Sequence, residues 1–166
     1  YSVVYTVVLK PHTDQNVVIG GAVGALPALI GWAAVTGTVG VPALVLGGVI
    51  FLWTPAHFYN LALVYKDDYA RADIPMLPVV RGDETTLRHI NLYLGATLLS
   101  VALLAYVSDL GWAFAAVTVA AGAVFIYFVV RLHRERTRAA AMRAFHSSNA
   151  FLGSVMLVLA VETLLL

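Results

Sequence analysis

The residues best suited to chemistry lie in one long polar stretch, residues 66–86, between two apolar runs. Its first charged residues are Lys66, Asp67, Asp68, Arg71 and Asp73. Carboxylate oxygens hold Mg²⁺, which in turn binds phosphate oxygens, while Lys and Arg neutralise the remaining negative charge. The pattern fits the headgroup of a prenyl diphosphate, whose lipid-soluble tail can lie between helices. A solvated loop whose acids merely balance its bases is the alternative interpretation of the same charges.

A histidine lies within the apolar run that precedes this stretch. His57 follows Trp53 and Pro55 and is next to Phe58. An ionisable residue inside a membrane span is costly and indicates function by default. The alternative is a neutral imidazole bonded to a carbonyl that Pro55 leaves free. Trp53 and its aromatic neighbours either pack in the core or shield an allylic cation.

Two further candidates lie near the start of the chain. Tyr5 and Lys10 are at the end of the first apolar run, residues 1–9. Lys10 is either an anchor at the membrane surface or a ligand for diphosphate. We interpret Tyr5 and Lys10 as candidate substrate-binding residues because both lie close to this end of the run.

The composition predicts the elements that must position these residues. Hydrophobic residues make up 61% of the chain and charged residues only 11%, with a mean hydropathy of +0.87, whereas soluble domains carry about 25% charged residues. A membrane helix needs roughly 20 apolar residues. Apolar runs of this kind cover residues 17–35, 41–65, 90–107, 112–130 and 147–166, and Glu162 in the last of them is their only charged residue. We expect an all-α polytopic transmembrane bundle with five complete spans and the end of a sixth.

The positive charges predict how this bundle is oriented. All ten Lys and Arg residues lie at or in the first, third and fifth polar breaks, and the two breaks between them have none. Basic residues in short loops stay on the cytoplasmic side. The acidic stretch should therefore face the cytoplasm of a prokaryotic cell membrane, or the matrix if the membrane is the mitochondrial inner membrane. A net charge of +1 argues against a nucleic-acid partner.

Three local patterns carry structural predictions. Gly20, Gly24 and Ala28 form a small-residue stripe that favours close helix packing. The apolar residues 74–80 favour a packed cap over the polar end of the bundle. Glu162, near the other end of the last span, is expected to contact water.

Several strings together resemble one known family. They are Leu9-Lys10 with Thr13 and Asn16, Val18-Ile19-Gly20-Gly21, Gly31-Trp32, Trp53-Thr54-Pro55-Ala56-His57-Phe58, Asp68-Tyr69, and Ile74-Pro75-Met76-Leu77-Pro78 with Gly82. In this order they resemble the haem O synthases (protohaem IX farnesyltransferases), a branch of the UbiA superfamily of intramembrane prenyltransferases. The match is densest over residues 9–82 and weaker as far as Phe145 and Ser148.

The resemblance implies a nine-helix bundle with two acidic motifs. Such enzymes use Mg²⁺ to help farnesyl diphosphate ionise, and a vinyl group of haem B attacks the farnesyl cation to give haem O. We expect residues 1–166 to form the C-terminal part of one such domain, preceded by helices that carry the first acidic motif. Farnesyl diphosphate, haem B and the lipid bilayer are the expected partners, and other haem A pathway enzymes are candidates.

The resemblance also gives the site residues their roles. Asp68 and His57 are the predicted catalytic residues, and Asp68 with Asp67 or Asp73 is the predicted Mg²⁺ ligand set. The predicted substrate-binding residues are Tyr5, Lys10, Trp53, Lys66, Tyr69 and Arg71. Asp73 stands where relatives usually have Gly, and Tyr59-Asn60 replace a more apolar pair. A UbiA-type enzyme for a quinone precursor and a membrane transporter or haem-binding protein remain the alternatives.

Overall fold

A computed structural model describes residues 13–165, which fold into helices with no strand in that range. The elements are α1 (Asn16–Thr36), α2 (Val41–Val64), α3 (Lys66–Arg71), α4 (Leu77–Val80), α5 (Gly82–Val107), α6 (Trp112–Glu135) and α7 (Arg138–Leu165). The five long helices are long and apolar enough to cross a membrane. The prediction of an all-α polytopic bundle with five complete spans is confirmed, and the expected remnant at residues 1–9 lies outside the described residues.

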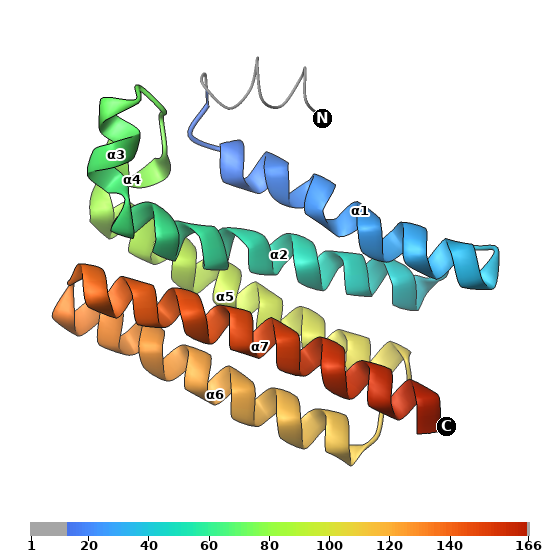
Figure 1. The fold of residues 1–166 in the computed structure, drawn as a ribbon. Helices are drawn as coiled ribbons and strands as arrows, with labels where there is room; N and C mark the ends of the chain where they lie inside the picture. Colours follow the sequence, from blue (N-terminus) through green and yellow to red (C-terminus); the bar gives the residue numbers. More distant parts are fainter. Residues whose placement is uncertain (1–12, 166) are drawn as a thin grey trace.

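The long helices run back and forth, so their connections alternate between two ends (Figure 1). The start of α1, the α3–α4 segment and the α6–α7 turn lie at one end. The α1–α2 and α5–α6 connections and the end of α7 lie at the other. The nine Lys and Arg residues of the described range therefore lie at or near a single end, which we call the cationic end. Which side of the membrane this end faces stays a prediction.

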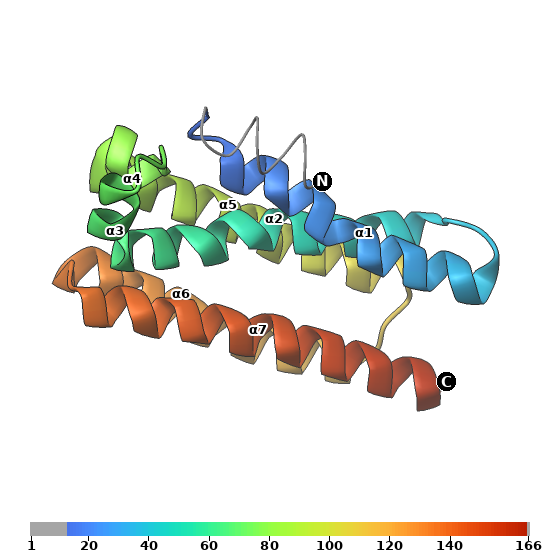
Figure 2. The ribbon, with the colours of Figure 1, turned by 45° about the horizontal axis from the view of Figure 1, so that its top comes forward.

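Helix α2 is the central element of the bundle. It contacts α1, α5 and α7, and Figure 2 shows α6 and α7 side by side, on the opposite side of α2 and α5 from α1. Twelve α2 residues are buried, whereas α1 buries four. Residues on α2 are thus the best placed to face the interior of the protein.

Glycine packing between α1 and α2 differs by one position from the predicted stripe. The buried face of α1 includes Val17, Gly21 and Ala25, not Gly20 and Gly24. A Cβ atom on Gly21 would lie 3.1 Å from Thr54 Cβ and 3.2 Å from the carbonyl oxygen of Phe51. That carbonyl is four residues before Pro55, which has no N–H to donate to it, and the bare glycine backbone can approach it closely.

Two helices begin much earlier than the uncharged runs predicted. Helix α5 starts at Gly82 rather than residue 90, and α7 starts at Arg138 rather than residue 147. Both extensions contain charged residues, which mark where a helix leaves the apolar core but do not end the helix itself. The fifth polar break therefore shrinks to Arg136 and Thr137.

The apolar residues 74–80 pack into the bundle at the cationic end, as expected. Met76 and Leu77 are 4% and 0% exposed and belong to the main hydrophobic core. Helix α4 contacts α5, α2 and α3. This packing fixes α3 as a short arm over the end of α2 (Figure 1).

Candidate active site

Helix α3 carries most of the charged residues that were predicted to bind diphosphate and metal. Asp67 and Asp68 lie in its first turn, Arg71 lies in its last, and all three are exposed. Arg71 pairs with Asp68, and Lys66 Nζ donates to Asp83 Oδ1 at 2.7 Å. Both cations therefore already neutralise carboxylates, and a diphosphate would have to compete for them. Asp67 makes no ion pair with any described residue.

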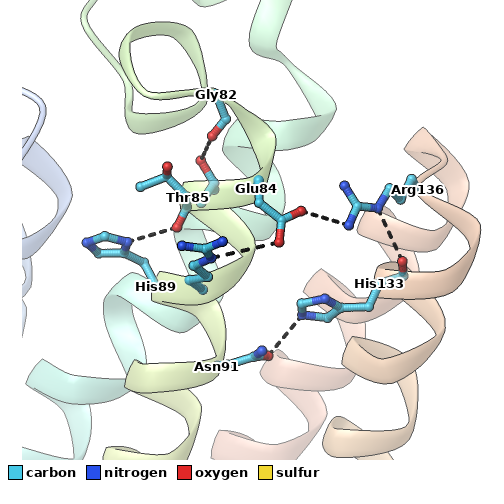
Figure 3. A network of polar contacts seen from close by, with 9 residues as sticks. Gly82, Glu84, Thr85, His89, Asn91, His133 and Arg136 are labelled. Carbon is cyan, nitrogen blue, oxygen red and sulfur yellow. Dashed lines mark hydrogen bonds and ion pairs between the residues drawn. The ribbon is translucent and has the colours of Figure 1, made fainter.

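Ion pairs join the three connections at the cationic end. Arg81, beside α4, pairs with Asp14 before α1. Arg136, in the α6–α7 turn, donates to Glu84 at 2.8 Å, and Arg88 lies 3.8 Å from the other oxygen of that carboxylate (Figure 3). Surface pairs of this kind contribute little stability individually. Together they hold the three loops in one charged rim.

Figure 3 also shows two histidines within this rim. His89 Nδ1 lies 2.9 Å from the carbonyl oxygen of Thr85, and His133 Nε2 lies 3.0 Å from Asn91 Oδ1. The second contact joins α6 to α5. Both rings form these hydrogen bonds with residues of α5, and neither bond involves the predicted metal ligands.

Asp73 has a structural role that the sequence did not indicate. Its φ of +53° is left-handed, and Ile74 N–H donates to the carbonyl of Tyr69 while Asp73 N–H donates to that of Ala70. This pair of bonds is a Schellman motif, in which glycine is the usual left-handed residue. The motif favours glycine at this position, and it means that Asp73 ends α3 whether or not it binds metal.

The fit of a divalent cation can be judged from the carboxylates present. No group of three or more His, Asp or Glu residues within the described part of the chain is close enough to hold a metal ion. Asp67 and Asp68 offer suitable hard oxygens, but neighbours on a helix project about 100° apart. An ion on Asp68 would therefore need oxygens from the ligand or from other parts of the protein. The metal role of Asp67, Asp68 and Asp73 stays a prediction.

Tyr69 lies on the inner side of the arm. It is half-buried and packs against the core. Burial, with a smaller effect of nearby Tyr65, raises the pKa of the Tyr69 hydroxyl. The phenol is therefore neutral at physiological pH and able to donate a hydrogen bond to an anionic ligand.

His57 occupies the interior of the bundle and is held from two sides. Its ring stacks on Trp53 and on Phe145, with 4.3 Å between ring centroids in each case. His57 Nδ1 lies 2.6 Å from Ser148 Oγ, and Trp53 Nε1 donates to the Ser148 carbonyl oxygen at 2.9 Å. The partner is thus on α7, not the free carbonyl of α2 that the sequence offered as an alternative.

Phe145 and Ser148 are the residues that sequence reasoning left without a role. The available signal was weak: Ser147 and Ser148 are adjacent polar residues within a helix that crosses the membrane. Nothing in the sequence links Ser148 to a histidine 91 positions away. Their contact depends on how α2 and α7 pack.

An apolar cavity of about 290 Å³ lies between α1 and α2, beside this cluster. It is lined by Val17, Gly20, Gly24, Ile50, Trp53, Thr54 and Phe58. Trp53 lines the cavity and also stacks on His57, so the two features share a wall. A cavity of this composition suits a hydrocarbon chain rather than a charged group.

Two buried polar atoms on α2 lack hydrogen-bond partners: Tyr59 Oη and Asn60 Oδ1. Both residues are 0% exposed. Unpaired polar atoms are costly in a membrane interior, so each marks a position where water or a ligand group would be stabilised. Both lie within one turn of His57, on the path toward α3.

The structure therefore separates the predicted site into two parts. His57 and Trp53 lie in the interior of α2, and Lys66, Asp67, Asp68, Tyr69 and Arg71 lie on α3 at the cationic end. The nine residues from His57 to Lys66 correspond to roughly 13 Å of helix. Tyr5 and Lys10 lie outside the described residues, so their predicted role is untested.

A bundle of five apolar spans with a charged rim and a polar interior position defines an integral membrane protein with a candidate site between its helices. A family model described as the UbiA prenyltransferase family matches residues 1–155. The chain belongs to this family, as its sequence motifs predicted.

Relatives of known name agree with this assignment. The chain is 63% identical over 164 residues to a protein of Halobacterium salinarum and 60% identical over 166 residues to one of Haloarcula marismortui, both named protoheme IX farnesyltransferase. It is 48% identical over 166 residues to a Saccharopolyspora erythraea protein named protoheme IX farnesyltransferase 1. These alignments cover 99%, 100% and 98% of this chain, but 37%, 36% and 53% of the relatives. The chain thus spans a little over a third of the length of the first two. No solved structure matches.

Proposed function

We propose that the full-length protein transfers the farnesyl group of farnesyl diphosphate to a vinyl group of protohaem IX, forming haem O. One observation carries the proposal. Helix α3, which follows α2 almost directly, has charged residues at the cationic end, and His57 on α2 lies roughly 13 Å away beside an apolar cavity. This separation matches a substrate with an anionic head and a hydrocarbon tail. The name of the relatives, protoheme IX farnesyltransferase, supports the same reaction.

The reaction divides between the two parts of the site. At the cationic end, the bond between the farnesyl carbon and diphosphate oxygen breaks, and diphosphate leaves. A vinyl carbon of haem bonds to the farnesyl carbon, water adds to the resulting cation, and one proton is released. Arg71, Lys66 and Tyr69 would bind the leaving group. Trp53 and the cavity between α1 and α2 would shield the farnesyl chain from water until the new bond forms.

To Asp73 we assign only the structural role of ending α3. We assign metal binding to Asp68 and Asp67. Mg²⁺, when bound there, would neutralise the departing diphosphate. The two aspartates would supply part of the ligand set, and the diphosphate oxygens another part. We place this end of the bundle on the cytoplasmic side because all nine Lys and Arg residues of the described part of the chain lie in, or within about two helical turns of, its connections.

The test is acceptor selectivity of the purified full-length protein in a bilayer. Given farnesyl diphosphate and Mg²⁺, it should convert haem B to haem O and should ignore an aromatic quinone precursor. Prenylation of the quinone precursor with haem B unchanged would assign the protein to another branch of the family. Removing the metal with a chelator should stop transfer to either acceptor.

A further inference from the structure

The hydroxyl of Ser148 makes two short contacts that together fix a proton. Ser148 Oγ lies 2.6 Å from His57 Nδ1 and 2.7 Å from the carbonyl oxygen of Phe145. Ser148 is 0% exposed and His57 only 6%, so bulk water does not mediate either contact. The contact between Ser148 and His57 must therefore be made with a proton of one of these two side chains.

Only one arrangement satisfies both contacts. A carbonyl oxygen cannot donate, so the 2.7 Å contact needs the hydroxyl proton. If that proton instead pointed at Nδ1, two oxygen lone pairs would face each other at 2.7 Å in a buried site, which is unfavourable. Ser148 must donate to Phe145 and accept from His57. His57 therefore carries its proton on Nδ1.

The other ring nitrogen is left with a lone pair. Nε2 accepts no hydrogen bond from the described residues, and it is not among the fully enclosed unpaired atoms there. The ring cannot easily turn to hide it, because Trp53 and Phe145 stack on its two faces. Trp53 is itself tied to the Ser148 carbonyl oxygen, so one residue on α7 restrains both α2 side chains.

We propose that Ser148 is a positioning residue that holds His57 in the Nδ1–H tautomer and so presents the Nε2 lone pair to an iron porphyrin. A hydrogen bond at one imidazole nitrogen commonly sets which nitrogen binds a metal. The identity of the ligand rests on the proposed function, whereas the tautomer does not. The tautomer of His57 and its binding to haem are therefore measured in separate experiments.

The tautomer is read from the ¹⁵N resonances of histidine-labelled full-length protein without haem. The His57 signals are assigned by their loss in His57→Gln. We expect the Nδ1–H form in the native protein and in Ser147→Ala, since the Ser147 hydroxyl donates to the carbonyl of Ala144 and makes no hydrogen bond to His57. Ser148→Ala should shift His57 toward the Nε2–H form. An Nε2–H or doubly protonated His57 in the native protein would overturn the proposal, as would an unchanged tautomer in Ser148→Ala.

The ligand is tested by titrating haem B without farnesyl diphosphate and following the Soret band. The native protein and Ser147→Ala should give the same ligated spectrum, His57→Gln should lose it, and Ser148→Ala should weaken haem affinity at least tenfold. A spectrum that is unchanged in His57→Gln would overturn iron ligation. Neither experiment measures transfer, so failure of the proposed function would appear only in the acceptor assay.

Discussion

Replacing Asp73 with glycine separates its backbone role from a role in metal binding. The left-handed conformation costs an ordinary residue about 1–2 kcal/mol, and aspartate tolerates it better than most, so relief of strain by Asp73→Gly should stabilise the protein by up to about 1 kcal/mol. If Asp73 only ends α3, farnesyl transfer and its Mg²⁺ dependence should stay within twofold of the native values. Asp73→Ala, which keeps a Cβ without the tolerance of aspartate, should destabilise by about 1 kcal/mol.

Asp109 provides the matched control. It has a φ of +51° and the same two backbone bonds, from Leu110 to Ala105 and from Asp109 to Tyr106. It belongs to the α5–α6 connection, which is at the opposite end of the bundle from α3 (Figure 1). Asp109→Gly should give a similar gain in denaturation midpoint with no effect on transfer. A tenfold loss of transfer in Asp73→Gly but not in Asp109→Gly would refute our assignment and make Asp73 a ligand.

Three further predictions concern the scaffold. Glu162 accepts N–H bonds from the start of α6, so Glu162→Gln, with one acceptor oxygen for two donors, should cost about 1 kcal/mol of unfolding free energy; no change in chemical denaturation would contradict this cap. Cysteines introduced at Ser108 and Thr137 in a cysteine-free background should react with an impermeant label from opposite sides; labelling from one side would disprove the helix count. Gly21→Ala should lower thermal stability because its Cβ would crowd α2, whereas Gly31→Ala, with nothing within 4 Å, should not; equal effects would argue against the close contact.

The overall architecture was predictable because membrane spans are defined by local composition. Each of the five apolar runs in the described part of the chain corresponds to a helix, and Pro27 and Pro55 lie inside helices. The starts of α5 and α7 were missed because a charge marks the edge of the apolar layer and not the end of hydrogen bonding. Glu162 was expected to contact water, but it caps the start of α6. The cap could not be predicted from the sequence because its partners lie 48 and 51 residues away.

The candidate site was predictable only where its residues are close in sequence. The charged residues of α3 are close to one another in sequence, and they share one short helix in the structure. The partners of those residues are not local: Lys66 pairs with Asp83, and His57 contacts Ser148. Pairings over such separations depend on helix packing, which hydropathy and motif spacing do not specify.

The most direct test of the two-part site compares Asp68→Asn and His57→Ala in the full-length protein, measuring farnesyl diphosphate binding and haem O formation for each. Asp68→Asn removes a ligand charge, and a loss of 3 kcal/mol of transition-state stabilisation would slow transfer by roughly a hundredfold. His57→Ala should keep native affinity for farnesyl diphosphate while impairing the use of haem B. Near-native haem O formation by Asp68→Asn, or loss of diphosphate binding in His57→Ala, would contradict the division of the site between α3 and the interior of α2.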